Sequence, residues 1–415
     1  MSLLESAAAL DAAHPGRRAE FLVPPDPSPS PYAEVAYLAG NSLGLQPRAT
    51  RAAVETELDD WARLAVEGHL EATHPWMPYH EELRADLAAI VGALESEVIA
   101  MNTLTVNLHL FMAAFYTPTP QRYKILIEDK VFPSDSYAVR SQLAWHGFDP
   151  DEGLIRMTPR PGEDCLRTED ILDVIATNDI ALTMFSTVGY LTGEVLDMPT
   201  ITNAAHASGA VVGWDLAHAA GNLELNLHDL GADFAAWCSY KYLNGGPGAI
   251  AGGFVHERHH GRTDLTRLEG WWSTSAESRF EMAPVSTPPA NADAWALSNS
   301  PILSLAPVRI SAAMFAESRM PTLRARSELL TGFLADGLEE IGAEIITPRE
   351  SSRRGSQLSV RVADAAATSA RLRHHHGVIA DARRPDVVRF APVPMYCSFN
   401  DCARVVEAMT TEVSR

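Results

Sequence analysis

The stretch Trp237–Gly248, WCSYKYLNGGPG, joins the end of an apolar run to Ser-Tyr-Lys and then to a glycine-rich turn. Upstream, the apolar run Ala210–Trp214 ends in Asp-Leu-Ala-His at positions 215–218. Short apolar runs of this kind are typical of buried strands. Ligands of open α/β sheets collect at the carboxyl ends of such strands. Asp215 and Lys241 are therefore expected at one ligand-binding edge of a sheet.

A lysine and an aspartate at neighbouring strand ends are what pyridoxal phosphate (PLP) needs. The lysine supplies an amine that bonds to the cofactor aldehyde. The aspartate keeps the pyridine nitrogen protonated, which makes the ring an electron sink, since an opposite charge shifts a pKa by ~1–3 units. Each residue alone also fits an ordinary role, as a surface lysine or a turn residue. The glycine-rich turn lacks the spacing of a nucleotide-binding P-loop.

Composition restricts the class of protein. The 415 residues favour two domains, and 46% apolar with 21% charged residues is typical of a soluble globular protein. A net charge of −20 argues against a nucleic-acid or anionic-membrane binder. The four cysteines have no metal-binding spacing. With no signal peptide and no long apolar run, we expect a cytoplasmic protein with neither a metal nor a membrane span.

Strand-like runs alternate with helical stretches from Tyr123 to Phe254, which predicts βαβ units and a mainly parallel sheet. A Pro-rich break follows, and then a long helical region to about Ile341, interrupted at Pro321. We expect an N-terminal segment (1–45) that joins a small domain, a large PLP-binding α/β domain (46–305) and a small α+β domain (306–415). The predicted strands are 124–127, 181–185, 210–214, 234–238, 250–255, 357–362 and 387–390.

A helix is expected from Met101 to Tyr116, with Asn102–Thr105 at its start. The free backbone N–H groups of a helix start suit a phosphate. A plain N-cap explains the same residues.

Taken together, these residues resemble the kynureninase family, which consists of PLP enzymes of the aspartate-aminotransferase fold type (fold type I). The resemblance covers nearly the whole chain. Its motifs are GNSLGL at 40–45, Gly68-His69, NTLTVNLH at 102–109, FPSD at 132–135, DLAHAAGN at 215–222, SYKYLN at 239–244, Gly270-Trp271, Ser298-Asn299 and RFAPVP at 389–394.

The resemblance implies a large domain with a mainly parallel seven-stranded type of sheet, PLP as cofactor and specific site residues. Lys241, Tyr240 and Asp215 would be catalytic, with Tyr240 the acid or base (or only a phosphate ligand). The implied cofactor-binding residues are Leu104, Thr105, Phe132, Pro133, Ser134, Asp135, Ser186, Asp215, His218, Tyr240, Lys241, Trp271 and Asn299, and the implied substrate-binding residues are Ser42, His69, Asn299 and Arg389.

The implied reaction is hydrolysis of L-kynurenine or L-3-hydroxykynurenine to an anthranilate and L-alanine, as in tryptophan catabolism and NAD biosynthesis. Arg389 would bind the substrate α-carboxylate. Because the Trp and Asn positions belong to the neighbouring subunit in this family, the resemblance also implies a homodimer with the active site at the interface. The substrate would be a small molecule, with no nucleic-acid partner.

Two features bear on ring specificity. One residue after Trp271, the family usually has a Gly-His pair, whereas this chain has Ser273-Thr274. The replacement removes an imidazole from the path to the substrate's aromatic ring and puts the ring specificity in doubt. His69 and Asn299 resemble the animal-type enzymes that prefer 3-hydroxykynurenine, because an imidazole and an amide can hydrogen-bond a ring hydroxyl. A purely structural His69 is the alternative.

Other features are interpreted as inert. His374–His376 is expected to be a solvated helix end, and Arg353-Arg354 and Arg383-Arg384 exposed basic spots. The rival functions are another fold-type-I enzyme, such as a cysteine desulfurase or an aminotransferase, and an inactive PLP-binding paralogue. A desulfurase would need a reactive loop cysteine, and neither Cys397 nor Cys402 is marked as one.

Overall fold

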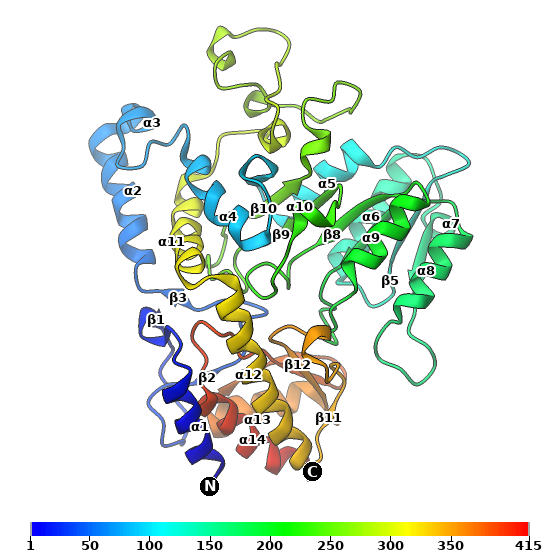
Figure 1. The fold of residues 1–415 in the computed structure, drawn as a ribbon. Coiled ribbons are helices and arrows are strands. Elements are labelled where there is room, and N and C mark those ends of the chain that lie inside the picture. The colour runs from blue at the N-terminus through cyan, green and yellow to red at the C-terminus, as the bar shows by residue number, and fades with distance from the viewer. Residues whose placement is uncertain (1, 414–415) are drawn as a thin grey trace.

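The computed structural model describes residues 2–413 and shows a large and a small β-sheet, one above the other in Figure 1. The large sheet has seven strands in the order β4-β10-β9-β8-β7-β5-β6. The pairings β6-β5-β7-β8-β9 are parallel, and β10 runs antiparallel to both β9 and β4. Its strands are β4 (Val98–Ala100), β5 (Lys124–Glu128), β6 (Leu154–Met157), β7 (Ile180–Ser186), β8 (Val211–Asp215), β9 (Phe234–Trp237) and β10 (Gly252–Val255).

Helices cover both faces of this sheet, and for that reason its strands are continuous apolar runs. Side chains of a strand alternate between faces, so Ile125 and Ile127 belong to one hydrophobic cluster while Leu126 belongs to the other. The first cluster includes α5 (Leu104–Phe115) and α6 (Pro133–Trp145). The second includes α4 (Arg84–Val91), α8 (Thr168–Thr177), α9 (Met198–Ala207) and α11 (Ile302–Ser318).

The small sheet is antiparallel, in the order β11-β12-β15-β14. The N-terminal segment packs here: β2 (Ala36–Tyr37) pairs with β13 (Val378–Ile379), and Ala7, Ala36 and Leu38 belong to the same apolar core. Both chain ends therefore lie at this end of the molecule (Figure 1). The remaining elements are α1 (Leu3–Ala13), α12 (Met320–Glu340), α13 (Ala365–His376), α14 (Phe399–Val413), β11 (Glu344–Ile345), β12 (Leu358–Arg361), β14 (Asp381–Arg383) and β15 (Val387–Phe390).

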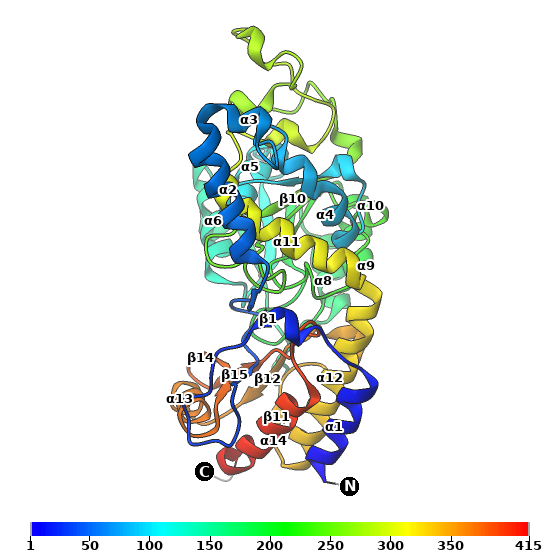
Figure 2. The ribbon, with the colours of Figure 1, turned by 90° about the vertical axis from the view of Figure 1, so that its left-hand side faces the viewer.

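The other end of the molecule carries α2 (Thr50–Leu64), α3 (Gly68–Glu71) and a long excursion between β10 and α11. The excursion stands out from the body in both side views (Figures 1 and 2). The remaining short elements are α7 (Pro150–Gly153), α10 (Leu227–Leu230), β1 (Phe21–Leu22) and β3 (Gln46–Pro47). None of the helices in residues 2–413 is both long and apolar enough to cross a membrane.

All seven strands predicted from the sequence are present, five in the large sheet and two (β12 and β15) in the small sheet. This confirms the α/β class. The long helical region breaks at Arg319, two residues before the predicted Pro321. Pro321 lies instead in the first turn of α12, where its missing N–H costs no hydrogen bond. The edge strands β4 and β6 are not predicted from the sequence, because they are only three and four residues long.

Candidate active site

Lys241 follows β9, which pairs with β8, and β8 in turn pairs with β7. Ser186 and Asp215 end these two strands and face each other in register. The loop at 40–45 packs onto the Lys241 turn, where the Gly44 N–H donates to the Tyr240 carbonyl at 2.8 Å. A Cβ at Gly44 would lie 2.4 Å from the Lys241 carbonyl oxygen. Only glycine allows this approach, which explains the Gly44 position of the motif.

Three carboxyl groups lie buried at this strand edge: Glu128, Asp135 and Asp215. Burial, and then the nearby Asp215 carboxyl, raises the pKa of Asp135 well above its ordinary value. Burial also raises the pKa of Glu128 to about 7. The Oδ2 atom of Asp135 is buried and has no hydrogen-bond partner among residues 2–413. The cluster is thus short of positive charge and of donors, which fits a protonated pyridine nitrogen.

Two helix starts meet next to these carboxyls. The hydroxyls of Thr105 in α5 and Ser134 in α6 hydrogen-bond to each other at 2.8 Å. Neither Thr103 nor Phe132, the N-cap residues, caps its helix with a side chain, so first-turn N–H groups remain available. Leu104 and Pro133 begin these two helices. A phosphate would complete both starts.

Aromatic rings and an imidazole surround the Lys241 amine. Its Nζ lies 5.8 Å from the centre of the Phe132 ring and 5.9 Å from that of Tyr240. Burial raises the pKa of Tyr240, which keeps its hydroxyl protonated. His218 is buried, and no described residue of the chain pairs with its Nδ1. Burial and the charge of Lys241 lower its pKa, so the imidazole is neutral.

Arg389 comes from the small sheet, and its side chain is only 1% exposed. It pairs with Asp381, which also pairs with Arg383 at 2.8 Å. The Ser42 hydroxyl donates to Asp381 at 2.6 Å. The rings of Tyr190 and Phe132 pack edge to face at 5.4 Å, which connects this cluster to the Lys241 side. Ser42 and Arg389, which the resemblance implies as substrate-binding residues, are thus brought together.

Sequence reasoning missed Asp381, Tyr190 and Arg383, and its interpretation of the arginine pairs was wrong in part. Arg383 is only partly exposed and lies in the cluster around Arg389, and Arg354 is 2% exposed. Arg384 is exposed, as predicted. The polar edge strand β14 has no apolar run that would mark it in the sequence. The residues that its side chains contact come from other segments of the chain.

His69, Trp271 and Asn299 lie elsewhere on the chain. Within residues 2–413, no hydrogen bond, ion pair or ring contact joins any of them to the residues around Lys241. His69 lies on α3, and Trp271 and Asn299 lie on the excursion before α11 and are exposed. In a single chain these three predicted residues are therefore not part of the Lys241 site.

Ser273 does not project toward a ligand. It is fully buried, donates its hydroxyl to the Ala296 carbonyl and accepts the Gly270 N–H at 3.0 Å. Thr274 accepts the Thr287 N–H at 2.9 Å. This pair therefore fixes the base of the excursion that carries Trp271, and any effect on the substrate ring would be indirect.

The cysteines and the histidine run agree with the sequence analysis. Cys397 and Cys402 are buried, and burial raises the pKa of both thiols, so neither is an exposed, reactive loop cysteine. His374 and His375 are exposed in the last turn of α13.

Comparison with known proteins gives a consistent family. The family model described as "Kynureninase C-terminal domain" matches residues 323–409. The chain is 57% identical to a kynureninase of Salinispora tropica, over 97% of this chain and 96% of the relative. It is 51% identical to a kynureninase of Myxococcus xanthus, over 95% of this chain and 93% of the relative.

Solved structures show the same fold at low identity. The cysteine desulfurase of Thermococcus onnurineus superimposes with a TM-score of 0.76 and 17% identity, covering 92% of this chain and 95% of that one. This similarity supports the fold-type-I assignment alone.

Proposed function

The chain belongs to the kynureninase family of PLP-dependent hydrolases, and on this premise we propose that it cleaves L-3-hydroxykynurenine in preference to L-kynurenine. Water adds to the ketone carbonyl of the substrate, and the bond between Cβ and Cγ breaks. The products are 3-hydroxyanthranilate and L-alanine. The observation that supports the ring preference is the packing of His69 against Trp76, which lines an apolar pocket described below.

PLP, once bound, supplies an electron sink for the carbon next to the substrate amine. We assign Lys241 to bond with the cofactor aldehyde and to move the proton at that carbon. Asp215, assisted by Asp135, would hold a proton on the pyridine nitrogen. The Phe132 ring would stack on the cofactor, and Leu104, Thr105 and Ser134 would hold the phosphate at the two helix starts, with Pro133 beside them in the cofactor pocket. Ser186 and His218 would complete the cofactor pocket.

Tyr240 is our candidate for the proton donor and acceptor on the hydrated ketone. Its hydroxyl starts the reaction protonated, because burial raises its pKa. It therefore acts first as an acid or a hydrogen-bond donor. Arg389 would hold the substrate carboxylate from the small sheet, together with Ser42.

A mainly apolar pocket of about 450 Å³ is lined by Trp61 and Trp76, by Glu57 and by residues 301–304. Trp76 lines it and packs edge to face against His69 at 5.5 Å. Pro301, two residues after Asn299 in the chain, also lines it, whereas His69 and Asn299 themselves are not among its lining residues. The His69 Nδ1 donates to the Val66 carbonyl at 2.9 Å. Nε2 is therefore the ring nitrogen left to accept from a hydroxyl on the substrate ring.

A homodimer would bring this pocket to the Lys241 site of the partner. The face around α2 and α3 exposes Trp61, Val66 and Leu70, at 60%, 70% and 70%. The excursion exposes Trp271 and Phe280, at 45% and 60%. Exposed apolar side chains that gather on one face are typical of interaction surfaces. Since Trp271 would reach the partner's phosphate, the dimer is part of the proposed active site.

The test compares kcat/KM of the PLP-loaded enzyme for the two substrates, side by side. We expect at least about tenfold preference for L-3-hydroxykynurenine, the size of a lost hydrogen bond to a buried polar group. Preference for L-kynurenine would refute the ring assignment, and no turnover of either would refute the activity. Sedimentation should show a dimer. We place the enzyme in the cytoplasm, where its hydroxylated product would serve NAD biosynthesis.

A further inference from the structure

Two arginines, Arg383 and Arg389, share the carboxylate of Asp381. Asp381 and Arg389 lie directly opposite each other in the β14–β15 register. Arg383 follows Asp381 by two residues, so both side chains leave the same face of β14. The Arg383 Nη2 lies 2.8 Å from the Asp381 carboxylate, and the Ser42 hydroxyl donates to the same oxygen at 2.6 Å.

This cluster carries one positive charge in excess, since two guanidinium groups share one carboxylate. The excess is costly because the Arg389 side chain is 1% exposed and that of Asp381 is 15% exposed. Burial accordingly lowers the pKa of Arg389 to about 10. One further carboxylate would make the cluster neutral.

Both arginines also have a hydrogen-bond donor to spare. The Nε atoms of Arg383 and Arg389 are buried and have no partner in the part of the chain that the structure describes. A buried donor without an acceptor is destabilising, so a ligand that supplies acceptors is favoured here. An incoming carboxylate has four lone pairs for such donors.

Arg383 lies close enough to the chemistry to take part. The guanidinium carbons of Arg383 and Arg389 lie 5.9 and 6.0 Å from the centre of the same Tyr190 ring. Tyr190 contacts Phe132, which contacts Lys241. The positive charges of both arginines also contribute to lowering the pKa of the buried His218, after burial and Lys241.

We propose that Arg383 is a second carboxylate-binding residue of the active site. Together with Arg389 it holds the α-carboxylate of the amino-acid substrate, while Asp381 and Ser42 act as positioning residues that fix the two guanidinium groups. The inference rests on the proposed function, because it assumes an amino-acid substrate at Lys241.

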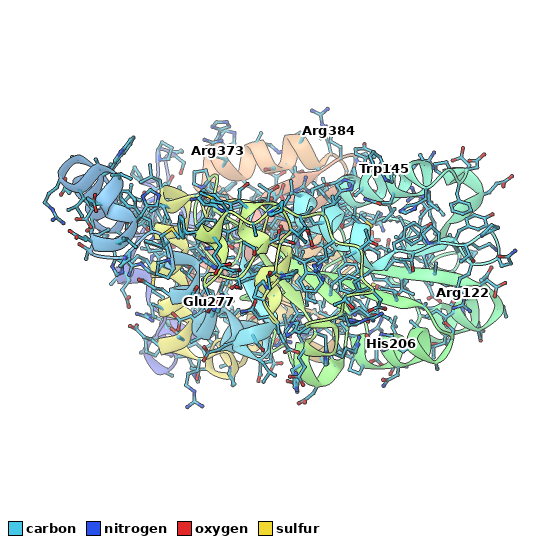
Figure 3. The ribbon with its side chains drawn as sticks, turned by 90° about the horizontal axis from the view of Figure 1, so that it is seen from above. Arg122, Trp145, His206, Glu277, Arg373 and Arg384 are labelled. Atoms are coloured by element: carbon cyan, nitrogen blue, oxygen red, sulfur yellow. The ribbon has the colours of Figure 1, made fainter. Side chains whose placement is uncertain are left out.

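The test measures ligand binding to the PLP-loaded dimer by the change in cofactor absorbance. L-Alanine, the proposed product, has the carboxylate, and L-alaninamide lacks its charge. The test variant is Arg383→Gln. The control is Arg384→Gln, because Arg384 is the next residue and points away from the body into solvent (Figure 3). Melting temperatures show whether each variant folds, and Arg383→Lys serves if the glutamine variant does not.

We expect Arg383→Gln to raise the Kd of L-alanine about tenfold or more, to leave that of L-alaninamide unchanged, and Arg384→Gln to change neither. The Kd of Arg383→Lys for L-alanine should lie between those of the wild type and Arg383→Gln. Lysine keeps the positive charge, but it cannot donate two parallel N–H groups to a carboxylate as arginine does. An equal change in Kd for both ligands would overturn the proposal. So would a Kd of Arg383→Gln for L-alanine within twofold of the wild-type value, since Arg383 would then pair with Asp381 without binding a ligand.

The outcome separates this inference from the proposed function. If the wild type hydrolyses 3-hydroxykynurenine and Arg383→Gln binds L-alanine normally, only the inference fails. If the wild type hydrolyses neither kynurenine and L-alanine binding depends on Arg383, the proposed function fails and the carboxylate site stands.

Discussion

Both carboxylate oxygens of Glu128 accept the backbone N–H of Ser186, at 3.2 and 3.3 Å. Glu128 ends β5 and Ser186 ends β7, so this contact ties together two strand ends under the candidate site. Burial raises the pKa of Glu128 to about 7, from an ordinary value of 4.5. The folded protein therefore holds a proton here at pH values where the unfolded chain has lost it.

This proton makes stability depend on pH. Between about pH 4.5 and 7 the folded state binds more protons at Glu128, so its contribution to the free energy of unfolding falls as pH rises. The slope is at most about 1.4 kcal/mol per pH unit. In Glu128→Gln this dependence should disappear, as measured by urea unfolding of the cofactor-free protein at several pH values. Glu95→Gln, at an exposed position, should keep it; equal slopes in wild type and Glu128→Gln would contradict the assignment.

The two aspartates near Lys241 should respond differently to the same substitution. The pKa of Asp135 is raised by burial and by Asp215, so asparagine imitates its protonated form. Asp135→Asn should therefore bind PLP and keep kcat within about tenfold. Asp215→Asn removes the charge assigned to the pyridine nitrogen, and kcat should fall about 10²–10³-fold. PLP absorbance and kcat for both variants check this, and a larger loss in Asp135→Asn would reverse the two roles.

Tyr240→Phe tests the proton donor. Because the hydroxyl is held protonated, its loss should lower kcat about 10²–10⁴-fold, with little change in KM. Tyr137→Phe is a matched control, since Tyr137 is 70% exposed. If Tyr240 is only a phosphate ligand, PLP affinity will fall and the kcat of the fully loaded variant will not.

How far the sequence predicts this site depends on the distance between the interacting segments. Asp215, Ser186 and Lys241 could be placed because each follows an apolar run, and parallel strands bring their ends together. Edge strands such as β14 lack that pattern, since their polar residues look the same in a loop. The pairing of Asp381 with Arg389, and the burial of Arg354, arise only when distant segments pack together.

His69 should act on ring preference alone. In His69→Ala, kcat/KM for L-3-hydroxykynurenine should fall about tenfold or more, while that for L-kynurenine should change little, because only the hydroxylated ring loses a partner. Kinetics on both substrates measure this. His375→Ala, at an exposed position on α13, should leave both values unchanged. Equal losses on both substrates would indicate that His69 is structural, through its contact with Trp76.

Gly44→Ala tests the close approach of the 40–45 loop to the Lys241 turn. The new Cβ would lie 2.3 Å from the Asn244 Oδ1 and 2.4 Å from the Lys241 carbonyl oxygen, so one backbone segment must move. We expect the melting temperature to fall and PLP affinity to weaken, because Ser42 and Lys241 lie on the two segments. Gly332→Ala is the matched control: a Cβ there meets nothing within 4 Å, and alanine in a helix gains about 0.5–1 kcal/mol over glycine. If Gly44→Ala kept the wild-type melting temperature and PLP affinity, the packing of this loop would not position Lys241.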